Sequence, residues 1–380
     1  ASTISGTASF NSTSNAITDS GTLAITGATT LNSGSADITL NEASSTFGTL
    51  VLTGANVAVT DAGAADLGVS TVSGTFGITS GGAITDSGTL AVTGDATFTN
   101  TSGSNDAITL DDASNAFAGT VTFATDSGSA VTIVDTTALD LKALSAASLS
   151  VTAGGAVTDS GTLAITGATT LNSGSADLTL DQSASTFGTL AITGANVAVT
   201  ENAAMDLGAS TISGTASFNS TSNAITDSGT LAITGATTLN SGSADITLNE
   251  AASTFGTLAI TGTNVAVTEN AAMDLGASTI SGTASFNSSN NAITDSGTLA
   301  ITGVTTLNSG SADLTLDEAA STFGALAITG ANVAVTENAA MDLGASTISG
   351  TASFNSTSNA ITDSGTLAIT GATTLNSGSA

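Results

Sequence analysis

The chain has 380 residues, with 30 acidic side chains and a single basic one, Lys142, and its formal net charge is −29. It contains no His and no Cys, which excludes disulfide frameworks, His- or Cys-ligated metals and catalytic triads built on His or Cys. The acidic balance excludes nucleic acid and anionic membrane surfaces as partners, because both require clustered Lys and Arg. No apolar run is long enough to cross a bilayer, so we expect no membrane insertion in this segment.

A recurring phrase, A-I/V-T-D-S-G, sets the period of the chain. Its Asp lies at positions 19, 86, 159, 227, 295 and 363, so the last three intervals are each 68 residues. Residues 1–21 are identical to 209–229 and to 345–365. This regularity predicts one continuous solenoid over 1–380. In chain order we expect a partial repeat at 1–21, repeats at approximately 22–88, 89–161 (diverged), 162–229, 230–297 and 298–365, and a partial repeat at 366–380.

Each 68-residue repeat divides into three pieces that are too short to be independent domains. In one copy the pieces span 162–188, 189–208 and 209–229, and each opens on a short β-branched segment and closes on Gly. Within the first piece Leu163 and Ile165 alternate with smaller residues, which predicts a strand with one buried face. We therefore predict an all-β, parallel β-helix (β-solenoid) with about three short strands per coil and three coils per repeat. Neighbouring repeats of the same chain would supply the core of each coil.

Several residues that recur at repeat spacing fit the core or the turns of such a solenoid. The Asn residues 172, 240 and 308 are expected to form turns. The Met residues and most of the Phe residues are expected to fill the core. The core set is Met205, Met273 and Met341, with Phe47, Phe187, Phe255 and Phe323 from S-T-F-G and Phe10, Phe218, Phe286 and Phe354 from A-S-F-N.

The diverged repeat at 89–161 carries extra residues, including 101–106, and the only Lys of the chain. Insertions in solenoids map to loops. Two interpretations stay open for this region: a diverged repeat with no special role, or a local recognition loop.

Paired aspartates provide the one candidate for metal chemistry. When coils are aligned at their closing Gly, the Asp of M-D-L-G or A-D-L-G falls opposite the Asp of T-D-S-G. Stacked carboxylates in neighbouring coils would lie about 5 Å apart. Screening by water and salt is one interpretation, and bridging by Ca²⁺ is the other. No further cofactor is expected. The candidate calcium pairs are Asp66 with Asp86, Asp206 with Asp227, Asp274 with Asp295, and Asp342 with Asp363.

The short T/S-L-x-I-x-G segments, the Asn- and Gly-rich turns, the lack of Cys and the near-perfect tandem repeats resemble filamentous-haemagglutinin-type and autotransporter-type adhesin repeats. The resemblance covers the whole chain and lies in its pattern. It implies a right-handed parallel β-helix and export through the outer membrane of a Gram-negative-type bacterium. It also implies a cell-surface or extracellular location and a role in attachment or surface architecture.

Together these features predict the structural or adhesive repeat region of a large extracellular bacterial surface fibre, without catalytic activity. Two alternatives stay open: a solenoid face that binds a ligand such as glycan or ice, and a self-associating sheath or surface-layer component. Expected partners are therefore lateral copies of the fibre or the surface glycans of host or neighbouring cells. A polysaccharide-active enzyme is disfavoured, because sugar sites usually offer aromatic faces and the chain has only 12 aromatic residues, all Phe.

Overall fold

The computed structural model describes residues 1–357 and 359–378, and within these the regular structure is entirely β-strand. The chain divides into an N-terminal unit, Ala1–Gly188, and a C-terminal unit, Thr189–Ala380. Each unit is a solenoid in its own right.

The N-terminal unit contains short strands of two to six residues. They are β1 (Ser2–Ile4), β2 (Ala8–Asn11), β3 (Ile17–Thr18), β4 (Leu23–Ile25), β5 (Thr29–Asn32), β6 (Ile38–Leu40), β7 (Thr49–Gly54), β8 (Val57–Asp61), β9 (Ala65–Leu67), β10 (Ser70–Val72), β11 (Phe76–Ser80), β12 (Ile84–Asp86), β13 (Leu90–Val92), β14 (Ala96–Asn100), β15 (Ile108–Leu110), β16 (Ala116–Phe117), β17 (Thr120–Ala124), β18 (Ala130–Asp135), β19 (Leu139–Leu141), β20 (Leu144–Ala146), β21 (Ser148–Ala153), β22 (Val157–Asp159), β23 (Leu163–Ile165), β24 (Ala168–Asn172) and β25 (Leu178–Leu180).

The C-terminal unit continues with strands of the same kind. They are β26 (Thr189–Gly194), β27 (Val197–Thr200), β28 (Met205–Leu207), β29 (Ser210–Ile212), β30 (Ala216–Asn219), β31 (Ile225–Asp227), β32 (Leu231–Ile233), β33 (Thr237–Asn240), β34 (Ile246–Leu248), β35 (Thr257–Gly262), β36 (Val265–Thr268), β37 (Met273–Leu275), β38 (Ser278–Ile280), β39 (Ala284–Asn287), β40 (Ile293–Asp295), β41 (Leu299–Ile301), β42 (Thr305–Asn308), β43 (Leu314–Leu316), β44 (Ala325–Gly330), β45 (Val333–Glu337), β46 (Met341–Leu343), β47 (Ser346–Ile348), β48 (Ala352–Ser356), β49 (Ile361–Asp363), β50 (Leu367–Ile369) and β51 (Thr373–Asn376).

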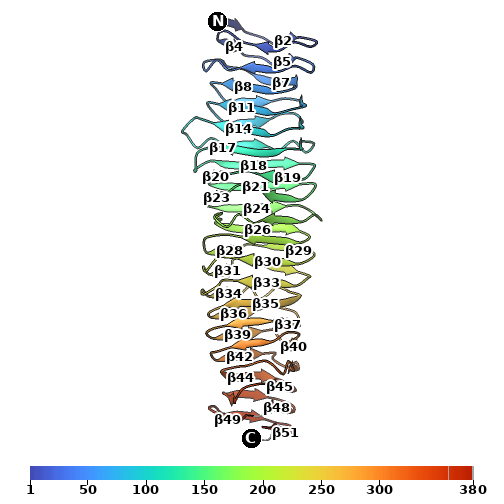
Figure 1. Cartoon of the computed structure of the whole chain (residues 1–380), viewed down its shortest axis with the longest axis vertical. Helices are drawn as coiled ribbons and strands as arrows, with labels where there is room; N and C mark the ends of the chain where they lie inside the picture. Colours follow the sequence, from blue (N-terminus) through green and yellow to red (C-terminus); the bar gives the residue numbers. More distant parts are fainter. Residues whose placement is uncertain (358, 379–380) are drawn as a thin grey trace. The chain divides into compact units, whose positions relative to one another are not determined.

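Strands pair in parallel with the equivalent strands of the next coil. Strand β11 lies between β8 and β14 in this way, and β30 lies between β27 and β33. Figure 1 shows the strands of each unit following one another from coil to coil in chain order. About three strands complete one coil. The predicted all-β parallel solenoid is thereby confirmed.

The core of each coil is built from alternate residues of its strands. In β26 the side chains of Leu190 and Ile192 are buried, while Ala191 between them is only half-buried. Because successive side chains on a strand point to opposite faces, this alternation sends one set inward and the other outward. The predicted core is confirmed for the three Met residues and for every named Phe except Phe10, which is 36% exposed.

The turns follow the local chemistry that was predicted for Asn. The side-chain Oδ1 of Asn172 accepts a hydrogen bond from the Gly174 N–H at 2.9 Å, and Gly174 has a φ of +61°. Only Gly adopts this backbone conformation at little cost. The same bond is made by Asn240 and by Asn308, each at 3.0 Å.

Where one strand pairs with two successive strands of the next coil, a serine hydroxyl accepts the hydrogen bond of a backbone N–H in place of a backbone carbonyl. Strand β26 pairs with β28 through its first residues and with β29 through its last. Between these pairings the Ile192 N–H donates to Ser210 Oγ at 3.0 Å, and that hydroxyl donates to the Gly208 carbonyl at 2.9 Å. The bend therefore leaves the buried N–H satisfied, as buried backbone groups require.

Candidate functional site

The predicted aspartate pairs do not lie in register. Asp206 pairs with Thr226, and Asp227 pairs with Leu207. Neighbouring strand positions point to opposite faces, so the two carboxylates of each pair are directed to opposite sides. The expectation that the closing Gly residues align was wrong, because the buried residues set the register instead. The same one-residue offset separates Asp66 from Asp86, Asp274 from Asp295, and Asp342 from Asp363.

In three pairs the first member, which is Asp66, Asp206 or Asp274, bonds to hydroxyl groups of the coils before and after it. Asp206 Oδ2 accepts from Thr189 Oγ1 at 3.0 Å and from Ser228 Oγ at 2.9 Å. Asp66 and Asp274 have the equivalent Thr and Ser donors, at 2.7–2.9 Å. At Asp342 the preceding position is Ala325 in place of Thr. These outward carboxylates connect three successive coils.

In three pairs the second member, which is Asp86, Asp227 or Asp295, accepts backbone N–H groups from the next coil. Asp227 accepts from the N–H of Asn249 at 2.8 Å and of Glu250 at 3.1 Å. Asp295 makes the equivalent pair of bonds to Asp317 and Glu318. Burial raises the pKa of Asp295 despite these bonds, and the nearby charges of Asp317 and Glu318 act in the same direction. Each of these carboxylates thereby holds in place the loop that precedes the following strand.

A third set of acids forms ladders with Asn and Thr on the outer surface. Asp245 Oδ1 accepts from both the backbone N–H and the Nδ2 of Asn264 at 3.0 Å. Asn264 Oδ1 in turn accepts from the N–H and the hydroxyl of Thr283 at 3.1 Å. The ladder recurs around Asp37 and around Asp313.

One acidic side chain per repeat is almost completely buried in the solenoid interior, at a position that the sequence reasoning missed. The residues are Asp61, Asp135, Glu201, Glu269 and Glu337, and each is at most 1% exposed. In V-A-V-T-E the Glu follows two inward Val residues at the same alternation, and this signal could have identified it.

Glu269, one of these buried carboxyls, is only partly hydrogen-bonded by the protein. Glu269 Oε2 accepts the Phe255 N–H at 3.0 Å, while its Oε1 has no hydrogen-bond partner. Burial disfavours the charged form. It raises the pKa of Glu269 to about 8 and that of Glu337 to about 7. Burial also raises the pKa of Asp61 and of Asp135.

The diverged repeat brings together Asp95, Thr120 and the charge of Lys142. The Thr120 N–H and hydroxyl donate to Asp95 Oδ1 at 3.0 and 2.8 Å. These bonds, with a smaller contribution from Lys142, lower the pKa of Asp95. The inserted residues 101–106 form a surface loop in which Gly103 and Asn105 have positive φ. A recognition role for this loop stays a hypothesis.

These acids make bonds between coils and do not gather into a metal centre. Among the described residues, no group of three or more Asp, Glu, His or Cys side chains is arranged to hold a metal ion. The predicted calcium pairs therefore lack the stacked arrangement of two carboxylates on which the calcium hypothesis was based. Isothermal titration with calcium chloride tests whether these acids bind calcium in another arrangement. The same residues contain no helix that is long and apolar enough to span a membrane.

The comparisons with known proteins match the repeat organisation. A family model described as repeats of unknown function (DUF5649) matches residues 1–53, 54–124, 128–193, 194–261, 262–329 and 330–380. The search of curated proteins gave no match, and neither did the search of solved structures.

Proposed function

We propose that this chain, which belongs to the family of repeats of unknown function (DUF5649), is the structural and adhesive repeat region of an extracellular bacterial surface fibre and has no catalytic activity. The observation that carries the proposal is that acidic side chains of this protein hydrogen-bond neighbouring coils to each other. Nearly all of its ionisable side chains are acidic. Those of the three aspartate sets hydrogen-bond one coil to the next. Side chains engaged in this way stabilise a stack.

The composition of the outer surface also supports a fibre. Outward strand positions are mostly Thr, Ser, Ala and Asn, as in β30 and β33. A net charge of −29 keeps such a chain soluble and discourages non-specific association. The pattern resemblance to filamentous-haemagglutinin-type and autotransporter-type adhesins points to the surface of a Gram-negative-type cell as its location.

An adhesion assay on the cells that express the protein tests this role. A strain whose gene lacks the whole repeat region should attach less to its natural surface than the parent strain. A strain lacking only repeat 230–297 is the matched control, and it should attach almost normally because the other repeats remain. Unchanged attachment in the complete deletion would contradict the proposed adhesive role.

A ligand-binding face is the second candidate, and a run of outward Thr favours it. Thr85, Thr109 and Thr132 lie in register on three successive coils. Regular Thr arrays suit binding to ice or to a glycan. In the C-terminal unit, however, Ala266 follows Thr247 in the equivalent run, so the array is interrupted there. Thermal hysteresis and a glycan array test this candidate, and activity that is lost in Thr109→Tyr would support it.

A further inference from the structure

Equivalent strands of successive repeats lie in different sheets of the C-terminal unit. The strands β27, β36 and β45 all contain V-A-V-T and begin one repeat apart, at Val197, Val265 and Val333. Strand β27 pairs with β30 in one sheet, β36 pairs with β39 in the other, and β45 pairs with β48 in the first sheet again. The six-residue strands β26, β35 and β44 alternate between the same two sheets. An advance of one repeat therefore exchanges the two sheets.

The number of coils in a repeat explains this exchange. In the sheet of β27 the order of parallel pairing is β27, β30, β33, β35, β37, β40, β43 and β45. These seven steps from coil to coil separate Val197 from Val333, which are two 68-residue repeats apart. One repeat therefore spans three and a half coils, where division of the sequence at Gly predicts three.

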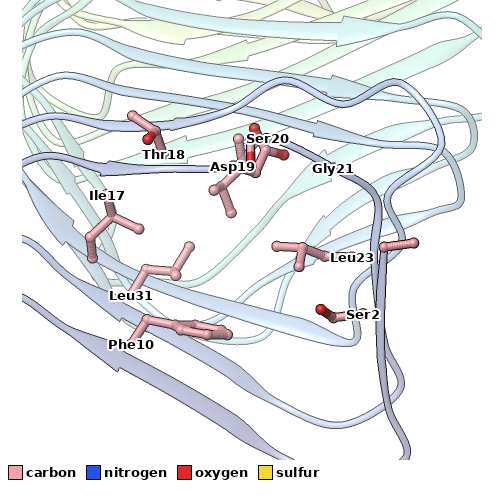
Figure 2. Close-up of a pocket in the computed structure, with 11 residues that line it drawn as sticks. Ser2, Phe10, Ile17, Thr18, Asp19, Ser20, Gly21, Leu23 and Leu31 are labelled. Atoms are coloured by element: carbon pink, nitrogen blue, oxygen red, sulfur yellow. The ribbon is translucent and has the colours of Figure 1, made fainter.

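Each advance of one repeat is close to a half turn about the solenoid axis, because two advances restore the original sheet. Figure 2 shows the first A-S-F-N segment, in which the Phe10 ring lies next to Leu31, its partner in the following coil. The Ser before this Phe points to the other side of the strand, and it is exposed at positions 217, 285 and 353. Ser217 and Ser353 consequently lie on one face of the unit, and Ser285 lies on the opposite face.

The outward side chains of both faces suit an uncharged, hydroxyl-rich partner. On one face Ser217 is in register with Thr238, and on the other Ser285 is in register with Thr306. Each face thus offers hydroxyl groups on neighbouring coils for hydrogen bonds. The net charge of −29 repels anionic polymers. Neutral polysaccharide is the class of polymer that meets both conditions.

We infer that the repeat region binds neutral polysaccharide on two opposite faces and thereby joins two surfaces, with equivalent sites recurring on each face every two repeats. The existence of a partner rests on the adhesive role proposed above, whereas the alternation of the faces does not. Equivalent sites on one face are about 34 Å apart, because seven coils are stacked at about 4.8 Å each. Several sites on one chain increase the avidity for each surface.

Distances between nitroxide labels, measured by double electron–electron resonance, test the alternation of the faces. The chain has no Cys, so labels attach only to introduced residues. A chain with Ser217→Cys and Ser353→Cys should give about 34 Å, which is seven coils along one face. A chain with Ser217→Cys and Ser285→Cys should give about 20 Å or more, because about 17 Å along the axis and both sheets separate the labels. A distance of about 14 Å, the value for three coils on a single face, would overturn the inference.

Deletion of 230–297 provides the matched control, because it removes one repeat from between the labels at positions 217 and 353. The part of the chain after the deletion should turn by about half a turn, so this pair should reproduce the distance of the Ser217–Ser285 pair. Circular dichroism establishes that each labelled chain is folded. A distance that stays at about 34 Å after the deletion would contradict the half turn.

Particles of the natural attachment surface test the two-sided binding. The purified chain should bind these particles and clump them, which raises the turbidity of the suspension. Periodate treatment of the particles beforehand should abolish binding, because it oxidises the diols of sugars. Binding without clumping would contradict attachment on two faces, and binding that survives periodate would contradict polysaccharide as the partner. Absence of any binding would overturn the adhesive role and the two-sided attachment with it, while the label distances decide the alternation separately.

Discussion

A carboxyl group recurs in the interior of a protein that has almost no positive charge to pair with it. Glu269 and Glu337 are both 0% exposed, and burial raises their pKa values to about 8 and about 7. A raised pKa means that the folded state holds a proton that the unfolded state releases near pH 4.5. These groups therefore contribute full stability below that pH, and their contribution is lost as the pH rises towards 8.

The first prediction concerns Glu269→Gln. The amide keeps the shape of the protonated acid but cannot ionise, so the variant should lose part of the decline in melting temperature between pH 5 and pH 8. Thermal melts across this range measure the difference, which should be largest at pH 8, where the variant is the more stable protein. Glu250→Gln, at a half-exposed side chain, is the control for removing one negative charge. Parallel pH profiles for wild type and Glu269→Gln would contradict the assignment.

The second prediction separates the two aspartates that the sequence had paired. Asp227→Ala removes the acceptor of two backbone N–H groups, which should cost about 1–3 kcal/mol. Asp206→Ala removes bonds to two hydroxyls that can turn to water, so it should cost about 1 kcal/mol or less. Thermal or denaturant unfolding ranks the two variants, and the reverse order would count against the register described here.

Strand and turn packing explains why Gly is placed where the coils touch most closely. A Cβ added to Gly235 would lie 2.5 Å from the carbonyl oxygen of Gly214 in the previous coil. At Gly77 in β11, an added Cβ would meet only the carbonyl oxygen of Val57, at an ordinary contact distance of 3.7 Å. Close approach of neighbouring coils, and not the turn itself, therefore requires Gly at position 235.

The third prediction compares these two glycines. Gly235→Ala forces the backbones of two coils apart and should destabilise the protein by about 2 kcal/mol or more. Gly77→Ala should change the melting temperature very little. Chemical denaturation of both variants measures the contrast, and equal effects would mean that coil spacing does not limit residue 235.

Much of this element-level structure could be predicted from the sequence because alternation is a local property. The Leu163–Ile165 pattern and the spacing of Met205 gave strands and core positions that are confirmed. The Asp register could not be found from spacing, because Asp227 takes an inward position above Leu207 at the end of its strand. Glu269 takes the next inward position after Val265 and Val267, although acidic residues are almost never fully buried unless they are paired. Phe10 differs from its copies only in what lies next to it, which no local pattern records.

At the scale of the whole molecule, the repeats act as interchangeable parts. The residues after Gly229 begin T-L-A-I-T-G at Thr230, and those after Gly297 begin with the same six residues at Thr298. In a solenoid each coil contacts only its neighbours, so stability is roughly a sum over coils and their interfaces. Removal of one complete repeat should therefore leave every remaining contact intact.

The fourth prediction follows from this exchangeability. Deletion of 230–297 should preserve the far-ultraviolet circular dichroism per residue and keep the melting temperature close to that of the wild type. Deletion of 230–263 joins Gly229 to Asn264 out of phase, so it should lower the melting temperature and broaden the transition. Similar behaviour of the two deletions would show that the 68-residue period does not govern the stacking.

We propose above that these coils form part of a fibre on the cell surface. Immunogold electron microscopy of intact, unpermeabilised cells with an antibody to the repeats is the sharpest test of this proposal. Gold particles are expected along filaments outside the cell, with no labelling of cells that lack the gene. Labelling that appears only after the cells are opened, with particles dispersed through the interior, would contradict it.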